Sequence, residues 1–195
     1  MSKKSNIDLP EVIKSGSAPG TSTSIASAAA LLGADLVVVA LAWDNPPSEG
    51  GIITITFLML ISFVAFINVM HSTMRAELLI ARIGMKEMDE EIRGKDSREL
   101  IRILKWLRVM HVSGLLFTML AFWIISYKYL ISINGYNFII LLLPFILFIL
   151  YWLPKIIGVE REVTLLSRES LVQFLIQIVF LILICLDFIR IITIF

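Results

Sequence analysis

Residues 51–70 read GIITITFLMLISFVAFINVM, a stretch without a single charged side chain. A helix of about 20 apolar residues is long enough to cross the hydrocarbon core of a bilayer, which is about 30 Å thick. Four other apolar stretches of similar length occur in the chain, which gives five predicted spans. These spans are roughly 24–43, 51–70, 109–128, 137–156 and 171–190. The sequence therefore predicts an all-α, polytopic integral membrane protein with about five transmembrane helices.

The composition agrees with this class and excludes others. Hydrophobic residues make up 58% of the chain, and the mean hydropathy is +0.89, whereas soluble domains average about 45–50% apolar residues. The formal net charge of +1 argues against a nucleic-acid partner. The single cysteine, Cys185, excludes an internal disulfide and a metal cage built from cysteines.

The distribution of lysine and arginine predicts an orientation. Fifteen of the 17 basic residues fall in the N-terminal segment, in residues 71–108 or between the fourth and fifth spans. Basic loops stay on the cytoplasmic side, so the N-terminus is predicted to be cytoplasmic and the C-terminus outside. Residues 1–20 are polar and are predicted to form a flexible cytosolic tail, with the transmembrane domain covering residues 21–195.

The segment between the second and third spans is predicted to be a cytosolic helical hairpin over residues 72–108. Its apolar and charged residues alternate at helical spacing on both sides of Gly94, which we take as the turn. Asp96 and Glu99 have the spacing of a capping box that would start the second arm. The core candidates are Leu79, Ile83, Ile92, Leu100, Ile103, Leu104 and Leu107. Two interpretations stay open, a hairpin that packs on itself or on a partner and a solvated helical loop.

Asp35 is the most costly residue of the predicted spans, about 12 Å inside the outer interface marked by Trp43. One interpretation is a group that binds a cation or a proton, and the other is a buried acid that is paired or protonated. The same span has small residues at helix-packing spacing, namely Ser22, Ala26, Ala29, Ala30, Gly33 and Ala34. Such a helix at an oligomer axis would present a ring of Asp35 carboxylates, and Asp44 and Glu49 in the following loop would flank the mouth.

Polar residues of the fifth predicted span gather on one side. Gln173, Gln177 and Asp187 fall within an arc of about 80° at 100° per residue. Arg190 follows Asp187 at i, i+3, a spacing that allows an ion pair. The set is predicted either to pair helices structurally or to line an ion or substrate path.

The two histidines of the chain, His71 and His111, each follow a Val-Met dipeptide at the inner ends of the second and third spans. Two imidazoles with nearby methionine thioethers would suit copper(I), and a titrating pair would sense cytosolic pH. Ordinary interfacial histidines are the simpler interpretation. The sequence therefore predicts no cofactor, and nothing else in it supports a metal ion.

Motifs of hydrolases, metalloproteases and P-loop enzymes are absent, which favours a protein that is not an enzyme, and a membrane enzyme with an unfamiliar site stays open as a third interpretation. The leading hypothesis is an oligomeric membrane channel or transporter-like protein for a small cation, with the intramembrane acid on its first helix. The alternative is a non-catalytic accessory or structural subunit of a larger membrane protein complex. The expected partners are the lipid bilayer and either further copies of the chain or other membrane subunits.

Overall fold

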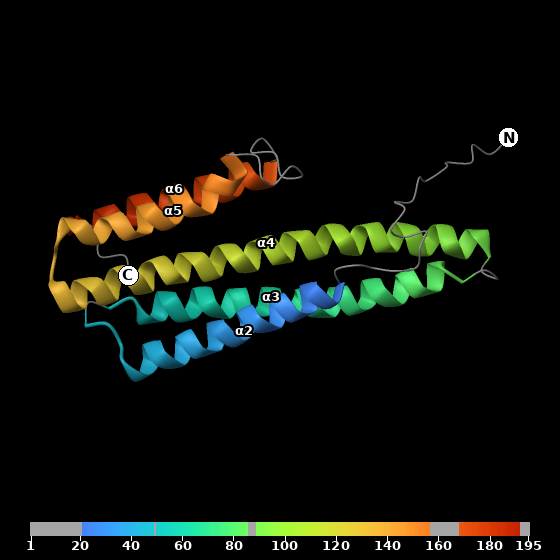
Figure 1. Cartoon of the computed structure of the whole chain (residues 1–195), viewed down its shortest axis with the longest axis horizontal. Coiled ribbons are helices and arrows are strands. Elements are labelled where there is room, and N and C mark those ends of the chain that lie inside the picture. Colours follow the sequence, from blue (N-terminus) through green and yellow to red (C-terminus); the bar gives the residue numbers. More distant parts are fainter. Residues whose placement is uncertain (1–20, 49, 86–88, 157–167, 192–195) are drawn as a thin grey trace. The chain divides into compact units, whose positions relative to one another are not determined.

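A computed structural model describes residues 21–48, 50–85, 89–156 and 168–191, and this part of the chain is helical without strands. Figure 1 shows the helices in chain order. They are α2 (Thr21–Asp44), α3 (Ile52–Ile83), α4 (Glu90–Asn134), the 3₁₀ helix η1 (Phe138–Leu141), α5 (Leu142–Ile156) and α6 (Arg168–Phe188). The predicted tail over residues 1–20 lies outside the described residues.

Within the described ranges, four helices are long and apolar enough to cross a membrane. Their candidate spans are Ile25–Asp44, Ile52–Ile83, Glu90–Asn134 and Ser170–Phe188. The predicted fourth span corresponds to a shorter apolar helix, Phe138–Leu153. Several apolar helices thus indicate a membrane-embedded protein, whereas the count of five spans and the orientation of the termini stay predictions.

The turn between α3 and α4 comes earlier in the chain than the sequence predicts. It lies between Ile83 and Glu90, and Gly94 is inside α4. One glycine in a helix interior costs only about 1 kcal/mol relative to alanine, which a long and well-packed helix tolerates. Asp89 supplies the start signal, because its Oδ1 accepts the N–H of Glu91 at 3.0 Å. The predicted turn at Gly94 and the capping box after it are therefore wrong.

The chain divides into two compact units, and α2, α3 and α4 each contribute to both. The first unit comprises the described parts of residues 1–34 and 63–114. Its core joins α3 to α4 through Ala76, Leu79, Ile80, Ile83 and Leu100. Two ion pairs flank this core, Arg75 with Glu99 and Arg82 with Asp96 at 3.3 Å. The residues that the sequence assigns to a capping box therefore hold the two arms of the hairpin together.

The predicted core of the hairpin is correct in part. Leu79, Ile83 and Leu100 are buried, but Ile92 is 46% exposed and Leu104 is 41% exposed. The prediction for Ile92 and Leu104 is wrong because α4 begins before the predicted turn at Gly94. The position of the actual turn sets which face of α4 meets α3.

The second unit comprises residues 35–62 and the described part of 115–195. Its core is one apolar cluster of buried residues from α3, α4, η1 and α6, and partly buried residues of α2 and α5 pack against it. The most deeply buried members are Ile55, Met59, Leu120, Ala121, Trp123, Ile124, Tyr127 and Ile184. The same unit buries two carboxylates, Asp35 and Asp187, and these define the candidate site.

Candidate functional site

Asp35 of α2 is 1% exposed and meets hydroxyl groups from two other helices. Thr118 Oγ1 of α4 donates to Oδ1 at 3.1 Å and lies 3.4 Å from Oδ2. Ser62 Oγ of α3 is 2.6 Å from Thr118 Oγ1 and also hydrogen-bonds the Asp35 side chain. Within the described residues, no lysine, arginine or histidine forms an ion pair with Asp35. The result is a buried carboxyl–hydroxyl cluster with one side chain from each of three helices.

The small residues of α2 lie on a different face from Asp35. Ala28, Asp35 and Ala42 are buried and recur every seven residues, so they form the inward stripe of the helix. The exposed small residues are Ala26, Ala29, Ala30, Gly33 and Ala34. At 100° per residue, this second group is centred about 180° from Asp35. A packing axis on the small-residue face would therefore not bring the Asp35 carboxylates together, because each one faces helices of its own chain.

Asp187 of α6 has a different environment. Lys128 Nζ of α4 lies 2.8 Å from Asp187 Oδ2, and both side chains are almost fully buried. The Tyr127 hydroxyl donates to the same oxygen at 2.9 Å. A buried carboxylate is thus matched by a buried ammonium and a neutral donor, which makes a compact charge-neutral link between α4 and α6.

The sequence assigns a different cation to Asp187. Arg190 lies beyond the end of α6 at Phe188 and has a φ of 57°. An i, i+3 pair requires the helix to continue, and this left-handed residue turns the chain away. The Arg190 guanidinium instead lies over the Tyr136 ring, 4.2 Å from its centroid. The predicted pair is therefore corrected to Asp187 and Lys128.

The other polar residues of α6 are also buried, with Gln173 at 6% and Gln177 at 0% exposure. The Trp152 indole N–H donates to Gln177 Oε1 at 2.6 Å, and Gln177 Nε2 lies 3.6 Å from Met119 Sδ. These contacts join α6 to α5 and α4. Gln177 therefore serves helix packing in this structure.

The structure describes one of the two predicted mouth residues, Asp44. Asp44 is exposed at the end of α2, and Glu49 lies outside the described residues. The Trp43 indole N–H donates to Thr56 Oγ1 at 2.9 Å, which ties the end of α2 to α3.

The two histidines have unlike surroundings. His71 is exposed, whereas His111 is partly buried and packs edge-on against Phe66, with 6.1 Å between ring centroids. Gly114 lies one turn beyond His111, and a Cβ there would come within 2.9 Å of the Phe66 ring. In the part of the chain that the structure describes, no group of three or more His, Cys, Asp or Glu side chains is arranged to hold a metal ion.

A hollow of about 330 Å³ lies next to the Asp35 cluster in the second unit. Its lining is nearly all apolar and consists of Leu115, Thr118, Met119, Phe122, Trp123, Leu147 and Tyr151. Thr118 belongs both to this lining and to the cluster, so it connects the buried carboxyl to the hollow.

No family model, curated protein or solved structure matches this chain. A functional hypothesis therefore has to start from the chemistry of the two buried carboxylates. Asp187 has the Lys128 ammonium beside it, whereas the side-chain partners of Asp35 are hydroxyls. Among the described residues, a counter-charge is therefore present at Asp187 and absent at Asp35.

Sequence reasoning singled out Asp35 and Asp187 but missed the groups that surround them. Ser62 and Thr118 lie well inside apolar spans, and hydroxyl residues at such depth are common enough to attract no notice. Lys128 stands at the predicted end of a span, where a lysine is expected to reach the interface. A search for polar residues at matching depths on neighbouring spans would have found all three.

Proposed function

We propose that this protein is an oligomeric membrane channel or transporter-like protein for a small cation. We further propose that this cation is a proton and that it binds to the carboxyl group of Asp35. The observation that carries the proposal is a carboxyl group that is 1% exposed and has the Ser62 and Thr118 hydroxyls as its side-chain partners. Ionisable residues within membrane helices are costly and commonly mark ion pathways or proton relays.

The contacts of the cluster favour a proton over a divalent metal ion. A buried carboxylate is costly unless its charge is neutralised. Ca²⁺ takes six to eight oxygen ligands, and Mg²⁺ demands an octahedron at about 2.0–2.1 Å. The two carboxylate oxygens, Ser62 Oγ and Thr118 Oγ1 are fewer than that, and the two hydroxyl oxygens are only 2.6 Å apart. A proton fits this cluster without moving a helix.

The hydroxyl groups also supply a way to transmit the protonation state. When Asp35 is ionised, Thr118 donates to the carboxylate and Ser62 can donate to Thr118. When Asp35 is protonated, its O–H can donate to Thr118, and the direction of the chain reverses because a hydroxyl both donates and accepts. Each reversal exchanges donor and acceptor in the hydrogen bonds between α2, α3 and α4, so the protonation state of Asp35 reaches side chains on the other two helices without a change in helix packing.

A flux measurement tests the proposal. The purified protein is reconstituted into liposomes that contain a pH-sensitive dye, and a potassium diffusion potential drives proton uptake. We expect uptake with the wild type and its loss with Asp35→Asn, which keeps the shape of the side chain but cannot carry the proton. Glu90→Gln is the matched control, because it removes one acid from the exposed first turn of α4 and should leave uptake unchanged.

Two results would contradict the proposal. Equal uptake by the wild type and Asp35→Asn would remove Asp35 from the mechanism, and no uptake by a well-folded wild type would remove cation transport itself. Infrared spectroscopy gives an independent readout, since a protonated Asp35 has a carboxylic C=O stretching band that Asp35→Asn lacks.

The exposed small-residue face of α2 favours the second candidate function, a non-catalytic subunit of a larger membrane complex. Small residues let helices approach closely, and a Cβ added at Gly33 would meet no described atom within 4 Å apart from its chain neighbours and its own helix backbone. The mass of the purified protein in detergent separates the two functions. A closed homo-oligomer that Gly33→Leu dissociates supports the channel or transporter, whereas a monomer that assembles only with other subunits supports the accessory role.

A further inference from the structure

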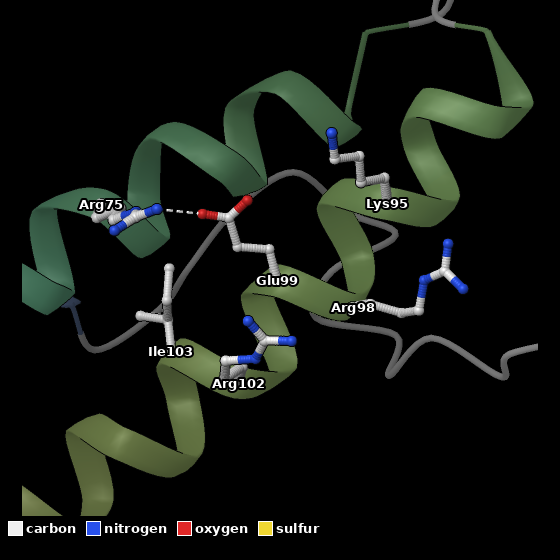
Figure 2. A pocket seen from close by; sticks show the side chains of 6 residues that line it. All are labelled: Arg75, Lys95, Arg98, Glu99, Arg102 and Ile103. Carbon is white, nitrogen blue, oxygen red and sulfur yellow. Dashed lines mark hydrogen bonds and ion pairs between the residues drawn. The ribbon is translucent and has the colours of Figure 1, made fainter.

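A basic pocket lies on the hairpin of the first unit, away from the residues of the Asp35 cluster in sequence. It has a volume of about 590 Å³ and is formed by α3 and α4. Its lining residues are Arg75, Lys95, Arg98, Glu99, Arg102 and Ile103. Figure 2 shows these side chains, with Arg75 reaching from α3 to Glu99 of α4. Four cationic groups and one carboxylate therefore share the pocket.

The charges of this pocket are not balanced by the chain's described residues. Glu99 is engaged by Arg75, whereas Lys95, Arg98 and Arg102 are exposed and form no ion pair with a described carboxylate. These three cations follow one another at i, i+3 and i+7 on α4, within an arc of about 60° at 100° per residue. They form one continuous basic stripe beside the Arg75–Glu99 pair.

The cationic side chains of the pocket stand on a tightly packed part of the α3–α4 helix pair. Asp96 and Leu100 lie on the side of α4 that packs on α3, and they are 5% and 0% exposed. Ile103 packs against the same core. The cationic side chains thus project from a helix pair that is fixed by apolar packing and two ion pairs, which holds them in place before a ligand arrives.

We propose that this pocket binds a phosphate-bearing anion, with the headgroup of an anionic lipid as its source. Guanidinium groups pair with phosphate oxygens through two parallel hydrogen bonds, so several arginines in one pocket suit phosphate better than a single carboxylate. Basic pockets next to membrane helices on the cytoplasmic side bind lipid headgroups in this way. The inference is independent of the function proposed for Asp35.

The end of the pocket nearest the predicted spans, at Arg75 and Arg102, favours lipid over a soluble phosphate compound. Arg75 lies five residues beyond the predicted span that ends at Met70, and Arg102 lies seven residues before the span that begins at Val109. At 1.5 Å per residue these are about 8 and 10 Å. Long arginine side chains can cover this distance to the headgroup layer.

Binding in nanodiscs tests the proposal. Native mass spectrometry measures lipid retained by the full-length protein from nanodiscs of phosphatidylcholine alone or mixed with phosphatidylglycerol or phosphatidic acid. A parallel arm titrates pyrophosphate into the phosphatidylcholine nanodiscs. We expect retention of the anionic lipids and a loss of about tenfold or more in Arg98→Gln/Arg102→Gln, since losing a hydrogen bond between a guanidinium and a charged phosphate oxygen costs about one order of magnitude in affinity.

A charge-matched control separates the pocket from general attraction. Lys105→Gln/Arg108→Gln removes two cations from the same helix but none from the pocket lining, and it should keep binding within about threefold of the wild type. Glu99→Gln removes the only carboxylate of the pocket and should tighten binding, an effect that a misfolded variant cannot give.

Each remaining result overturns part of the proposal. Equal losses in the two double variants would mean diffuse attraction and no pocket, and retention that ignores lipid charge would exclude a phosphate ligand. Tight pyrophosphate binding that anionic lipid does not displace would keep the pocket but reject the lipid source.

Discussion

Asp35 and Asp187 are both buried in the second unit, yet their partners differ in kind. Asp187 meets the Lys128 ammonium at 2.8 Å and the Tyr127 hydroxyl at 2.9 Å. Asp35 meets hydroxyl groups from two helices and has no cation beside it among the described residues. Asp187 thus has its counter-charge within the chain, whereas the described residues supply no counter-charge to Asp35. Burial alone therefore does not show whether a carboxylate is neutralised within its own chain, whereas the charge of its partners does.

The largest expected effect comes from breaking the Asp187 pair. Lys128→Met should destabilise the protein by about 3–5 kcal/mol, because it leaves a buried carboxylate without its cation. Thermal unfolding in detergent measures this change. The double variant Lys128→Met/Asp187→Asn should recover much of the loss, and a single variant as stable as the wild type would show that the pair does not form.

The next largest effect concerns the neutral donor at the same carboxylate. Tyr127→Phe removes a hydrogen bond to a charged group, which is worth about 1.5–3 kcal/mol. We expect a matching fall in unfolding free energy, measured by denaturant titration. If Tyr127→Phe loses less unfolding free energy than Thr118→Val, Asp187 is not ionised. The proposed difference in charge between Asp187 and Asp35 would then be wrong.

A smaller effect is expected for the corresponding change at the other carboxyl group. Thr118→Val keeps the shape of the side chain but removes its contacts with Asp35 and Ser62. Hydrogen bonds between membrane helices average about 0.6 kcal/mol, so we expect a loss of about 1 kcal/mol in the same denaturant titration. A loss as large as that of Tyr127→Phe would indicate an ionised Asp35.

The smallest effect on stability is expected for Asp35→Asn. The amide can still accept the Thr118 hydrogen bond, so the unfolding free energy should change by no more than about 0.6 kcal/mol. The same variant should lose proton uptake in liposomes. A strongly destabilised Asp35→Asn that keeps its uptake would make Asp35 a structural residue and remove its contrast with Asp187.

Periodicity and charge in the sequence predicted much of the hairpin but not its turn. Leu79, Ile83 and Leu100 were recognised as core because apolar residues recur at helical spacing. The low helix propensity of glycine predicts a turn at Gly94, but the packing of the two arms outweighs that local preference. The basic residues that line the hairpin pocket were visible only as a charge excess, because their gathering depends on which face of α4 meets α3.

The candidate site shows the same division. The cost of burying a charge identified Asp35 and Asp187 from the sequence, but their partners lie 83 and 59 residues away along the chain. Local spacing along one helix predicts an ion pair between Asp187 and Arg190. This pair does not form because α6 ends before Arg190. Contacts between helices depend on how the helices pack, and the spacing of residues within one helix does not predict that packing.

By itself, the sequence determined that the chain forms long apolar helices and that two acids are buried among them, because hydropathy and the cost of charge burial depend on the residues alone. Only the tertiary structure decided that Asp187 is neutralised by Lys128 and that Asp35 is surrounded by hydroxyls. The physical reason is that a carboxylate's electrostatic state depends on groups within a few ångströms, and distant parts of the chain supply those groups.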